Sequence, residues 1–406
     1  MKAVLRYLSL FGLVFALPLQ AEPEAATALS PPPDSPAPPP AAPDPIPVSA
    51  ATWRQAIEPW TWQFPRDHGA HPDFKSEWWY FTGNLQDSMQ RKFGYQLTIF
   101  RQGVQFTPAQ LDSKWAVRDF YFGHLTISDL STGKFHVTER VTRGALGEAA
   151  AATDHMEVSL GPWSIKQTGR GQIQLKAADD DIAIDLAARP RTPPVLEGVN
   201  GLSQKAPGAG NASYYYSYPL LETSGQIRVG EMTYSVTGQS WFDHEFSTSL
   251  LGKDQVGWDW FCIQLDNREQ IMLYAMRDKS GKMDPVSEGT WIKADGTSVR
   301  IEPASFFIEK TGTWKSPKSG ATYPAGWAIS IPGHQIDLIV TPAMADQELH
   351  LNKMGALDYW EGATTIRGKE GAETVSGVGY TELTGYGQSL KTGMPAQPPV
   401  PTDTVP

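Results

Sequence analysis

Apolar and polar residues alternate with a period of two along most of the chain, and no other sequence feature restricts the fold as strongly. From about residue 77 onward, roughly eighteen such runs follow one another, and turn residues bound each of them. Patterns with the helical period are scarce, and only 108–114 and 145–152 suit a short helical turn. The alternation therefore predicts an all-β protein.

Consecutive runs are joined by short turns. The segments 226–238, 258–278 and 288–303 each predict a hairpin, and the last contains Asp-Gly, a dipeptide that tolerates the positive φ of tight turns. Many hairpins without crossover helices favour up-and-down closure. About 340 residues lie between the low-complexity ends, enough for two medium domains. We therefore expect two side-by-side antiparallel β-barrels, at 53–247 and 248–390.

The two ends of the chain differ in composition from this β region. Residues 1–21 carry Lys2 and Arg6 ahead of an apolar run and end in small residues, which is typical of a cleaved signal peptide; an uncleaved anchor is the alternative. Pro and Ala dominate residues 22–52, which predicts a disordered linker, and the similar composition of residues 391–406 predicts a disordered tail. The signal peptide predicts a periplasmic or secreted protein.

Charge and cysteine content exclude several classes of function. The net charge of −10 argues against nucleic-acid binding, which requires a basic surface. Cys262 is the single cysteine, so stability must come from packing without an intramolecular disulfide. Its position within a predicted strand suits a small buried residue better than a nucleophile. The chain has neither a G-x-S-x-G elbow nor a phosphate-binding glycine loop.

A first group of candidate residues occupies the segment FPRDHGAHPDFKSEWWYFTGNL. It holds His68, His71 and Glu77 beside Trp78 and Trp79. Two imidazoles and a carboxylate can bind a metal ion, which makes the two histidines weak metal candidates. Their loop is rich in Pro and Gly, so a hydrogen-bonded loop that closes the mouth of a barrel is the favoured interpretation.

A second group lies in GQSWFDHEFSTS. Alternation places Trp241, Asp243 and Glu245 on one face of a strand and residues 242, 244 and 246 on the other. A carboxyl group on an aromatic inward face is costly to ionise, so burial would raise its pKa and make Asp243 a proton donor at neutral pH. The alternative is an Asp satisfied by backbone amides and by Arg or His partners at a domain interface.

A third group combines aromatic rings with acids in the second half of the chain. Most of these side chains are expected in the core, but their density near acids makes some of them candidates for ligand binding. The candidates are Trp258, Trp260, Tyr359, Trp360 and Glu361, and Glu382 and Tyr386 follow in the expected closing strand.

Five segments in this order resemble the AttH-like branch of the carotenoid 1,2-hydratase superfamily. They are FPRDHGAHPDFKSEWWYFTGNL, ASYYYSYP, TGQSWFDHEFSTS, GWDWFCIQL and YWEGA, and the resemblance covers about residues 60–386. It implies tandem lipocalin-like (calycin) barrels in a secreted bacterial protein. The family name derives from an operon with a transporter of the ATP-binding cassette (ABC) type, which implies a transport partner.

The resemblance also implies a chemistry, because enzymes of this superfamily hydrate apolar polyenes. An acid protonates an isolated C=C bond, and water captures the tertiary cation. By its position in W-F-D-H the acid corresponds to Asp243, and His244 and Glu77 are further catalytic candidates. Aromatic faces would stabilise the cation by ~1–2 kcal/mol each. The implied rings are Trp79, Trp241 and Trp258.

Three functions remain open on this basis. The first is an exported carrier that binds a lipid or isoprenoid in an aromatic-lined cavity, without a cofactor and with an ABC transporter as partner. The second is a hydratase or isomerase of an apolar alkene, such as an acyclic carotenoid or terpenoid, with Asp243 as general acid. The third is a structural or interaction protein with a filled core. We expect Asp243 and Glu77 to lie within one cavity or at one interface, because both belong to the most aromatic segments of the chain.

Overall fold

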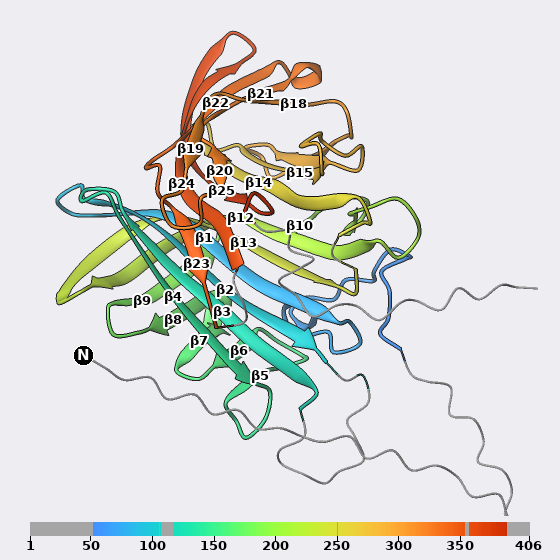
Figure 1. Ribbon diagram of the computed structural model, residues 1–406, viewed down its shortest axis with the longest axis vertical. Helices are drawn as coiled ribbons and strands as arrows, with labels where there is room; N and C mark the ends of the chain where they lie inside the picture. The colour runs from blue at the N-terminus through green and yellow to red at the C-terminus, as the bar shows by residue number, and fades with distance from the viewer. Residues whose placement is uncertain (1–51, 105, 107–116, 250, 354–356, 388–406) are drawn as a thin grey trace, which may run out of the picture. The chain divides into compact units, whose positions relative to one another are not determined.

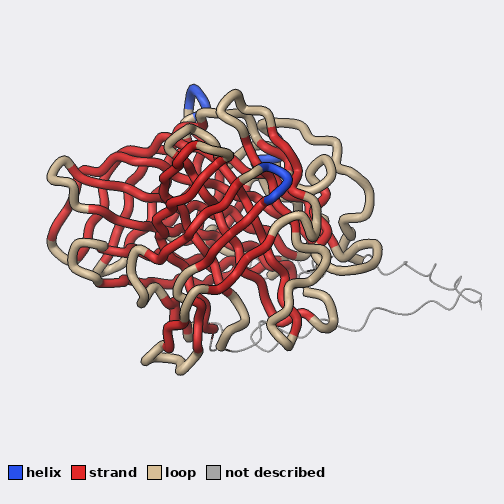
Figure 2. Tube along the Cα trace, turned by 90° about the horizontal axis from the view of Figure 1, so that it is seen from above, coloured by secondary structure: helices blue, strands red, loops and turns tan. Residues whose placement is uncertain are grey.

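The structure, a computed structural model, describes residues 52–104, 106, 117–249, 251–353 and 357–387. The predicted signal peptide, nearly all of the spacer at 22–52, the possible turn at 108–114 and the tail at 391–406 lie outside these residues. Residues Ala50–Pro406 form one compact unit. Strands dominate it, and the described residues contain only three short 3₁₀ turns (Figure 2).

The first sheet is antiparallel and joins thirteen strands in the order β4-β3-β2-β1-β13-β12-β9-β8-β7-β6-β5, with β10 and β11 paired to β12. Its strands are β1 (Ser76–Asp87), β2 (Lys92–Gly103), β3 (Asp119–Asp129), β4 (Lys134–Arg143), β5 (Ala149–Ala151), β6 (Glu157–Leu160), β7 (Trp163–Gln167), β8 (Ile173–Ala178), β9 (Ile182–Pro190), β10 (Val195–Leu196), β11 (Leu202–Gln204), β12 (Ala212–Val229) and β13 (Met232–Ser247). Because β3 and β4 at one end contact β6 near the other, this sheet curls into a nearly closed barrel.

The second sheet follows in the order β17-β16-β15-β14-β25-β24-β22-β21-β18, with β23 paired to β24. Its strands are β14 (Gln255–Leu265), β15 (Gln270–Asp278), β16 (Glu288–Ile292), β17 (Ser298–Ile301), β18 (Phe307–Lys310), β21 (Trp327–Ile331), β22 (Ile336–Pro342), β23 (Glu348–Leu351), β24 (Leu357–Glu370) and β25 (Glu373–Leu383). The remaining elements are the ladder of β19 (Thr313–Lys315) with β20 (Thr322–Pro324) and the turns η1 (Arg66–His68), η2 (Gly169–Gly171) and η3 (Pro332–His334).

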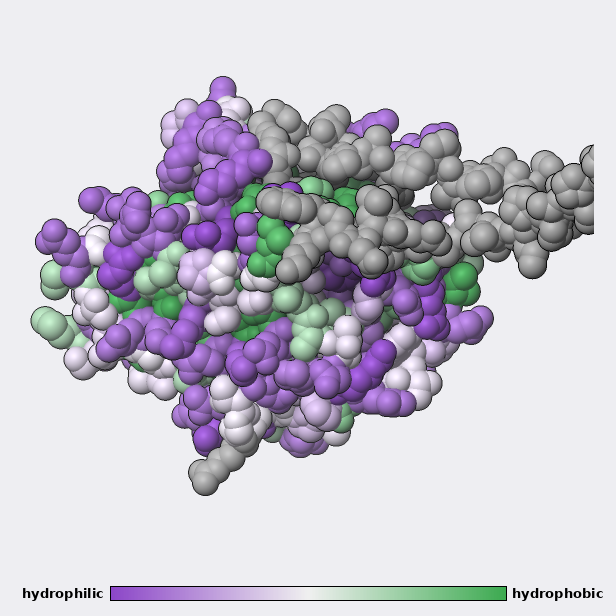
Figure 3. All heavy atoms as spheres, turned by 90° about the horizontal axis from the view of Figure 1, so that it is seen from below, coloured by the Kyte–Doolittle hydropathy of each residue, from purple (hydrophilic) through white to green (hydrophobic). Residues whose placement is uncertain are grey.

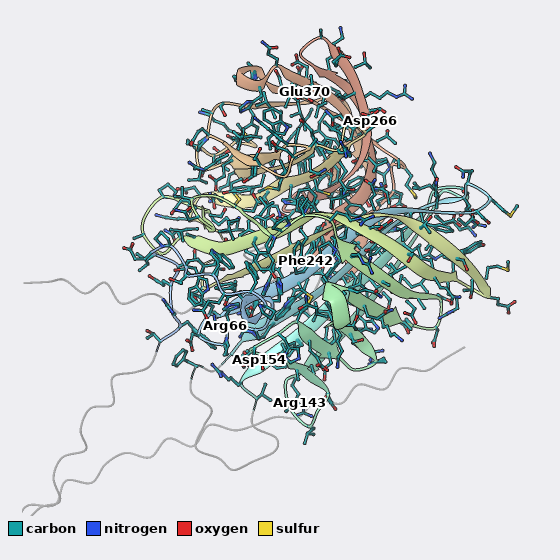
Figure 4. All side chains as sticks on the ribbon, turned by 180° about the vertical axis from the view of Figure 1, so that it is seen from behind. Arg66, Arg143, Asp154, Phe242, Asp266 and Glu370 are labelled. Carbon is teal, nitrogen blue, oxygen red and sulfur yellow. The ribbon has the colours of Figure 1, made fainter. Side chains whose placement is uncertain are left out.

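The predicted all-β, lipocalin-like architecture is confirmed. The three predicted hairpins are present as β12–β13, β14–β15 and β16–β17. At the tip of the second hairpin, Asn267 donates a hydrogen bond to Glu370, and Figure 4 shows Glu370 close to Asp266 at this end of the second sheet. The prediction of a short helical turn at 145–152 is wrong. Leu146 and Gly147 have positive φ, which interrupts a right-handed turn, and the alanines that follow pair as β5 with β6.

Apolar side chains gather in three main layers. One core lies inside the first sheet and includes Trp79 and Leu97, and another lies inside the second sheet and includes Trp327. A third layer joins residues of both sheets, among them Trp241 and Trp260. Across this interface β1 contacts β25, and β12 contacts β14 and β15. In Figure 1 the second sheet, yellow to red, lies against the blue to yellow-green first sheet.

The outer surface is largely polar where it can be seen. Hydrophilic residues prevail on the face drawn in Figure 3, and apolar residues appear there in small groups. Within the described part of the chain, no helix has the length and apolar character needed to cross a membrane.

Candidate functional site

Strand β13 lies between β1 and β12 and brings the central acid to the interface between the sheets. Asp243 is directly opposite Tyr80 on β1 and Ser217 on β12. Directly opposite residues of antiparallel strands project from the same face, so these three side chains point toward the second sheet. The preceding residue, Phe242, points the other way and stacks on Phe81 in the core of the first sheet at 4.4 Å between centroids.

A cavity of about 110 Å³ lies at this interface. Aromatic rings from both sheets and several acids form its wall. The lining residues are Ser76, Glu77, Trp78, Tyr80, Phe100, Arg101, Gln102, Phe122, Lys205, Tyr215, Asp243, Glu245, Ser249, Trp258, Trp260, Tyr274, Met276 and Glu382. An apolar cavity of about 150 Å³ in another protein binds benzene, so this smaller cavity suits a branched alkyl end or the leading part of a small ring.

The cavity has a buried end and a more exposed end. Asp243 and Trp260 are 4% and 5% exposed. Trp78, Trp258 and Glu382 are only half-buried. A ligand that enters past the half-buried rings therefore places its leading end beside Asp243.

Three donors hold the carboxyl group of Asp243. Oδ1 accepts hydrogen bonds from Ser217 Oγ at 2.6 Å and Trp241 Nε1 at 2.7 Å, and Oδ2 accepts one from Tyr215 at 2.9 Å. A carboxyl group offers about four lone-pair positions, so Oδ2 keeps a position for a proton. Burial raises the pKa of Asp243 to about 7, against the lowering effect of the three hydrogen bonds. Asp243 therefore exchanges a proton near neutral pH.

Glu382 on β25 is a second acid of the cavity wall. Trp258 Nε1 donates a hydrogen bond to its Oε2 at 2.9 Å. Desolvation raises the pKa of Glu382 to about 7; the Trp258 hydrogen bond lowers it, and the nearby carboxyl groups of Glu245 and Asp243 raise it further. The first and second sheets thus each contribute one acid that titrates near neutral pH.

Two further buried acids adjoin the cavity. Glu361 accepts a hydrogen bond from Tyr80 at 2.8 Å, and burial raises its pKa well above the ordinary value. Burial also raises the pKa of Glu197 to about 8, against a hydrogen bond from Thr290. Burial therefore disfavours the charged form of both acids in this part of the interface.

Glu77 belongs to a separate polar cluster on the opposite face of the first sheet. Its backbone forms part of the cavity strand β1, but its Oε1 lies 2.8 Å from His71 Nδ1 and 2.9 Å from His244 Nε2. Arg101 Nε donates to its Oε2 at 3.0 Å. Burial would raise the pKa of Glu77, but Arg101 and the two histidines hold it below the ordinary value. Both Asp243 and Glu77 thus belong to the wall of one cavity. Their carboxyl groups, however, project from opposite faces of the first sheet, and only that of Asp243 points toward the second sheet.

The same cluster contains the histidine and acidic groups that could hold a metal ion. One ligand atom each of His71, Glu77 and His244 lies within 4.8 Å of the others. These atoms already contact one another, however, and His71 Nε2 lies 3.2 Å from Asp67. Burial would lower the pKa of His71, but its carboxylate neighbours raise it, which favours an imidazolium over a metal ligand. The residues therefore fit a buried charge network better than a metal centre. His68 is not in this group.

The family model described as AttH-like matches residues 55–386. The chain belongs to the AttH-like family. A crystal structure of a Nitrosomonas europaea protein assigned to AttH is 32% identical, covers 82% of this chain and 99% of its own, and superposes with a TM-score of 0.73. Kievitone hydratase from Nectria haematococca is 18% identical, covers 80% of this chain and 92% of its own, and has a TM-score of 0.61, which shows a common fold. No curated protein sequence matches this chain.

In this AttH-like chain only some predicted site residues meet at the cavity. Trp78, Trp258 and Trp260 line it, and Trp241 adjoins it through its hydrogen bond to Asp243. Glu361 adjoins the cavity through its hydrogen bond from Tyr80. The others lie elsewhere: Trp79 stacks on His244 in the core of the first sheet, Trp360 is in the core of the second sheet, Tyr359 contacts His124, and His68 contacts Tyr216. Strand alternation explains the difference, because adjacent residues such as Trp78 and Trp79 face opposite ways.

Tyr215 and Lys205 of the cavity wall were absent from the predicted site, and Glu382 was named only as part of the expected closing strand. Tyr215 comes from ASYYYSYP, and Glu382 from GYTELTGY, where an acid lies inside a strand. Lys205 lies 3.2 Å from Glu245 and over the Tyr274 ring at 4.2 Å. An acid in the middle of a predicted strand is a sequence signal that could have identified Glu382 as a site residue. The sequence around Lys205 contains no comparable signal.

Proposed function

We propose that the protein binds an apolar small molecule in the cavity between its two sheets. The aromatic lining of that cavity carries the proposal, because ligand sites are typically concave, mostly apolar and provided with few polar groups. The volume suits the branched end of an isoprenoid or the leading part of a small unsaturated ring. The rest of a longer ligand would extend past Trp78 and Trp258.

Quenching of tryptophan fluorescence tests this proposal. Trp78, Trp258 and Trp260 lie at the cavity, so titration with 1-methylcyclohexene or an acyclic isoprenoid should quench part of the emission in a saturable way. Replacing Trp260 with Ala should weaken binding and reduce the quenching. Replacing the distant Trp291, which donates its Nε1 hydrogen bond to Glu269, should leave the affinity unchanged. Equal affinities for both variants would contradict binding in this cavity.

A second candidate function is hydration of an alkene in the same cavity. The observation that favours it is the carboxyl group of Asp243, which keeps a position for a proton at the buried end of an aromatic cavity. Its proton forms a C–H bond with the π electrons of the alkene and leaves a tertiary cation. A lone pair of water then forms the C–O bond, and the resulting oxonium ion loses one proton to solvent or to a nearby carboxylate to give the alcohol, while Asp243 regains its proton from solvent. The faces of nearby rings such as Trp260 stabilise the cation by ~1–2 kcal/mol each.

Isotope incorporation tests the hydration step. The protein is incubated with 1-methylcyclohexene in water enriched in oxygen-18, and the products are analysed by mass spectrometry. Formation of labelled 1-methylcyclohexanol above the rate without protein supports hydration. Saturable binding without any labelled alcohol would leave the carrier function and exclude hydration of this alkene.

We also propose that the protein acts after export and delivers or receives its ligand at an ABC transporter. The basic and apolar start of the chain supports export, and the family resemblance supports the partner. Edman sequencing of protein from the cell envelope should begin near Glu22. Recovery of an intact Met1 in a membrane fraction would contradict cleavage.

A further inference from the structure

We propose that Glu382 is the general base of the cavity, which takes a proton from the attacking water on the side of the alkene opposite Asp243. This assignment rests on the hydration function proposed above. It adds a second reacting group and a stereochemical outcome to that function. The expected product is that of anti addition of water.

The two acids reach the cavity from different sheets. Asp243 is on β13 of the first sheet, and Glu382 is on β25 of the second, opposite Trp260 on β14. Both line the same cavity. An alkene held between the sheets therefore meets one carboxyl group on each side.

The side chains of Asp243 and Glu382 differ in solvent exposure, and this difference assigns the acid role to one and the base role to the other. Asp243 is 4% exposed and holds its carboxyl group among three donors, so it lies where water is scarce. Glu382 is half-buried, and one hydrogen bond from Trp258 fixes its Oε2. Water that enters from the more exposed end reaches Glu382 first, whereas the alkene end reaches Asp243.

Repulsion between the carboxylates of Asp243 and Glu382 favours a form in which only one of the two acids is protonated. The carboxyl group of Asp243 contributes to raising the pKa of Glu382, so ionisation of both acids together is disfavoured. A pair of interacting acids titrates in two steps and holds one proton between them over the intermediate pH range. In the productive form that proton is on Asp243, and Glu382 is a carboxylate.

The reaction balances with these two groups alone. The π electrons take the proton of Asp243 and leave its carboxylate; the water oxygen forms the C–O bond, and one water proton moves to Glu382. The products are the alcohol, ionised Asp243 and protonated Glu382. Exchange of one proton with solvent at each acid restores the starting form.

Glu382→Gln in the full-length protein tests the assignment. The variant should bind 1-methylcyclohexene within a few-fold of the unaltered protein, but its hydration rate should fall by ~10²-fold or more. Its pH–rate profile should lose the acidic limb, which reports the base. Glu373→Gln, at the exposed start of the same strand, removes a carboxylate without touching the cavity and should change neither quantity.

Two further measurements guard against a variant that is merely damaged. Glu382→Ala should recover part of its rate with added formate, a small carboxylate that can occupy the vacated space. In D₂O the unaltered protein should deliver deuterium and hydroxyl to opposite faces of 1-methylcyclohexene, which NMR resolves. Full activity of Glu382→Gln, absence of formate rescue or syn addition each overturns the role of Glu382 while hydration stands. Absence of hydration by the unaltered protein overturns the hydration function itself.

Discussion

Asp243→Asn should change the pH dependence of stability in a direction that follows from the burial of its carboxyl group. Burial raises the pKa of Asp243 from 3.8 in the unfolded chain to about 7. Between these values the folded protein binds more protons than the unfolded chain, so this group's contribution to stability is fully present below pH 4 and is lost as the pH rises through 7. The loss amounts to about 4 kcal/mol, since each pKa unit corresponds to about 1.4 kcal/mol.

Asparagine cannot ionise, and the variant therefore escapes this loss. Its amide oxygen can still accept the hydrogen bonds from Ser217 and Trp241, but the NH2 group that replaces the other carboxylate oxygen cannot accept the one from Tyr215, at a cost of about 1–3 kcal/mol. About 3 kcal/mol of the loss falls between pH 5 and pH 8, so we expect the stability of Asp243→Asn relative to the unaltered protein to rise by about 3 kcal/mol over this interval.

Urea unfolding followed by tryptophan fluorescence at pH 5, 6.5 and 8 measures this difference. Acids that do not interact with Asp243 titrate alike in both proteins and cancel in the comparison, whereas loss of the Asp243 carboxyl group also lowers the pKa of Glu382. Asp254→Asn, at an exposed position, is the matched control and should run parallel to the unaltered protein. A difference between Asp243→Asn and the unaltered protein that stays constant from pH 5 to pH 8 would refute the raised pKa.

Three further outcomes follow from the remaining contacts. Trp258→Phe removes the hydrogen bond that lowers the pKa of Glu382. The acidic limb of the pH–rate profile for 1-methylcyclohexene hydration should therefore move to higher pH, and an unchanged limb would contradict a hydrogen bond from Trp258 to Glu382. Glu77→Gln should lower the free energy of unfolding by about 3–5 kcal/mol in denaturant titrations, because it leaves the buried charge of Arg101 without its carboxylate partner. A loss below ~1 kcal/mol would contradict a buried charge network. Elemental analysis of dialysed protein should find less than stoichiometric zinc, because the atoms of His71 and His244 are engaged with Glu77, and one zinc per chain would contradict this.

The sequence predicted the parts of the fold that local patterns determine. Period-two alternation located the hairpins, and it placed Asp243 and Phe242 on opposite faces of one strand, as the structure does. Alternation does not say which face meets another sheet. Trp78 and Trp79 were therefore both expected at the ligand, whereas only Trp78 lines the cavity and Trp79 stacks on His244.

The composition of the site could not be predicted because it depends on pairing between distant strands. Tyr215 reaches Asp243 because β12 pairs with β13, and Glu382 reaches the same cavity because β25 pairs with β14 and the second sheet packs on the first. No local signal fixes these partners. Glu77 was expected beside Asp243 because both lie in aromatic segments, but the register of β1 turns its carboxyl group to the opposite face.

Native mass spectrometry of protein purified from its own cells, with extraction of any bound compound, tests the central claim of an apolar ligand in this cavity most directly. We expect one small apolar molecule per chain, with an unsaturated ring or branched end. The matching crystal structure should place that end between Asp243 and Trp260. A protein that carries no such compound, and that takes up neither 1-methylcyclohexene nor acyclic isoprenoids on titration, would contradict the claim.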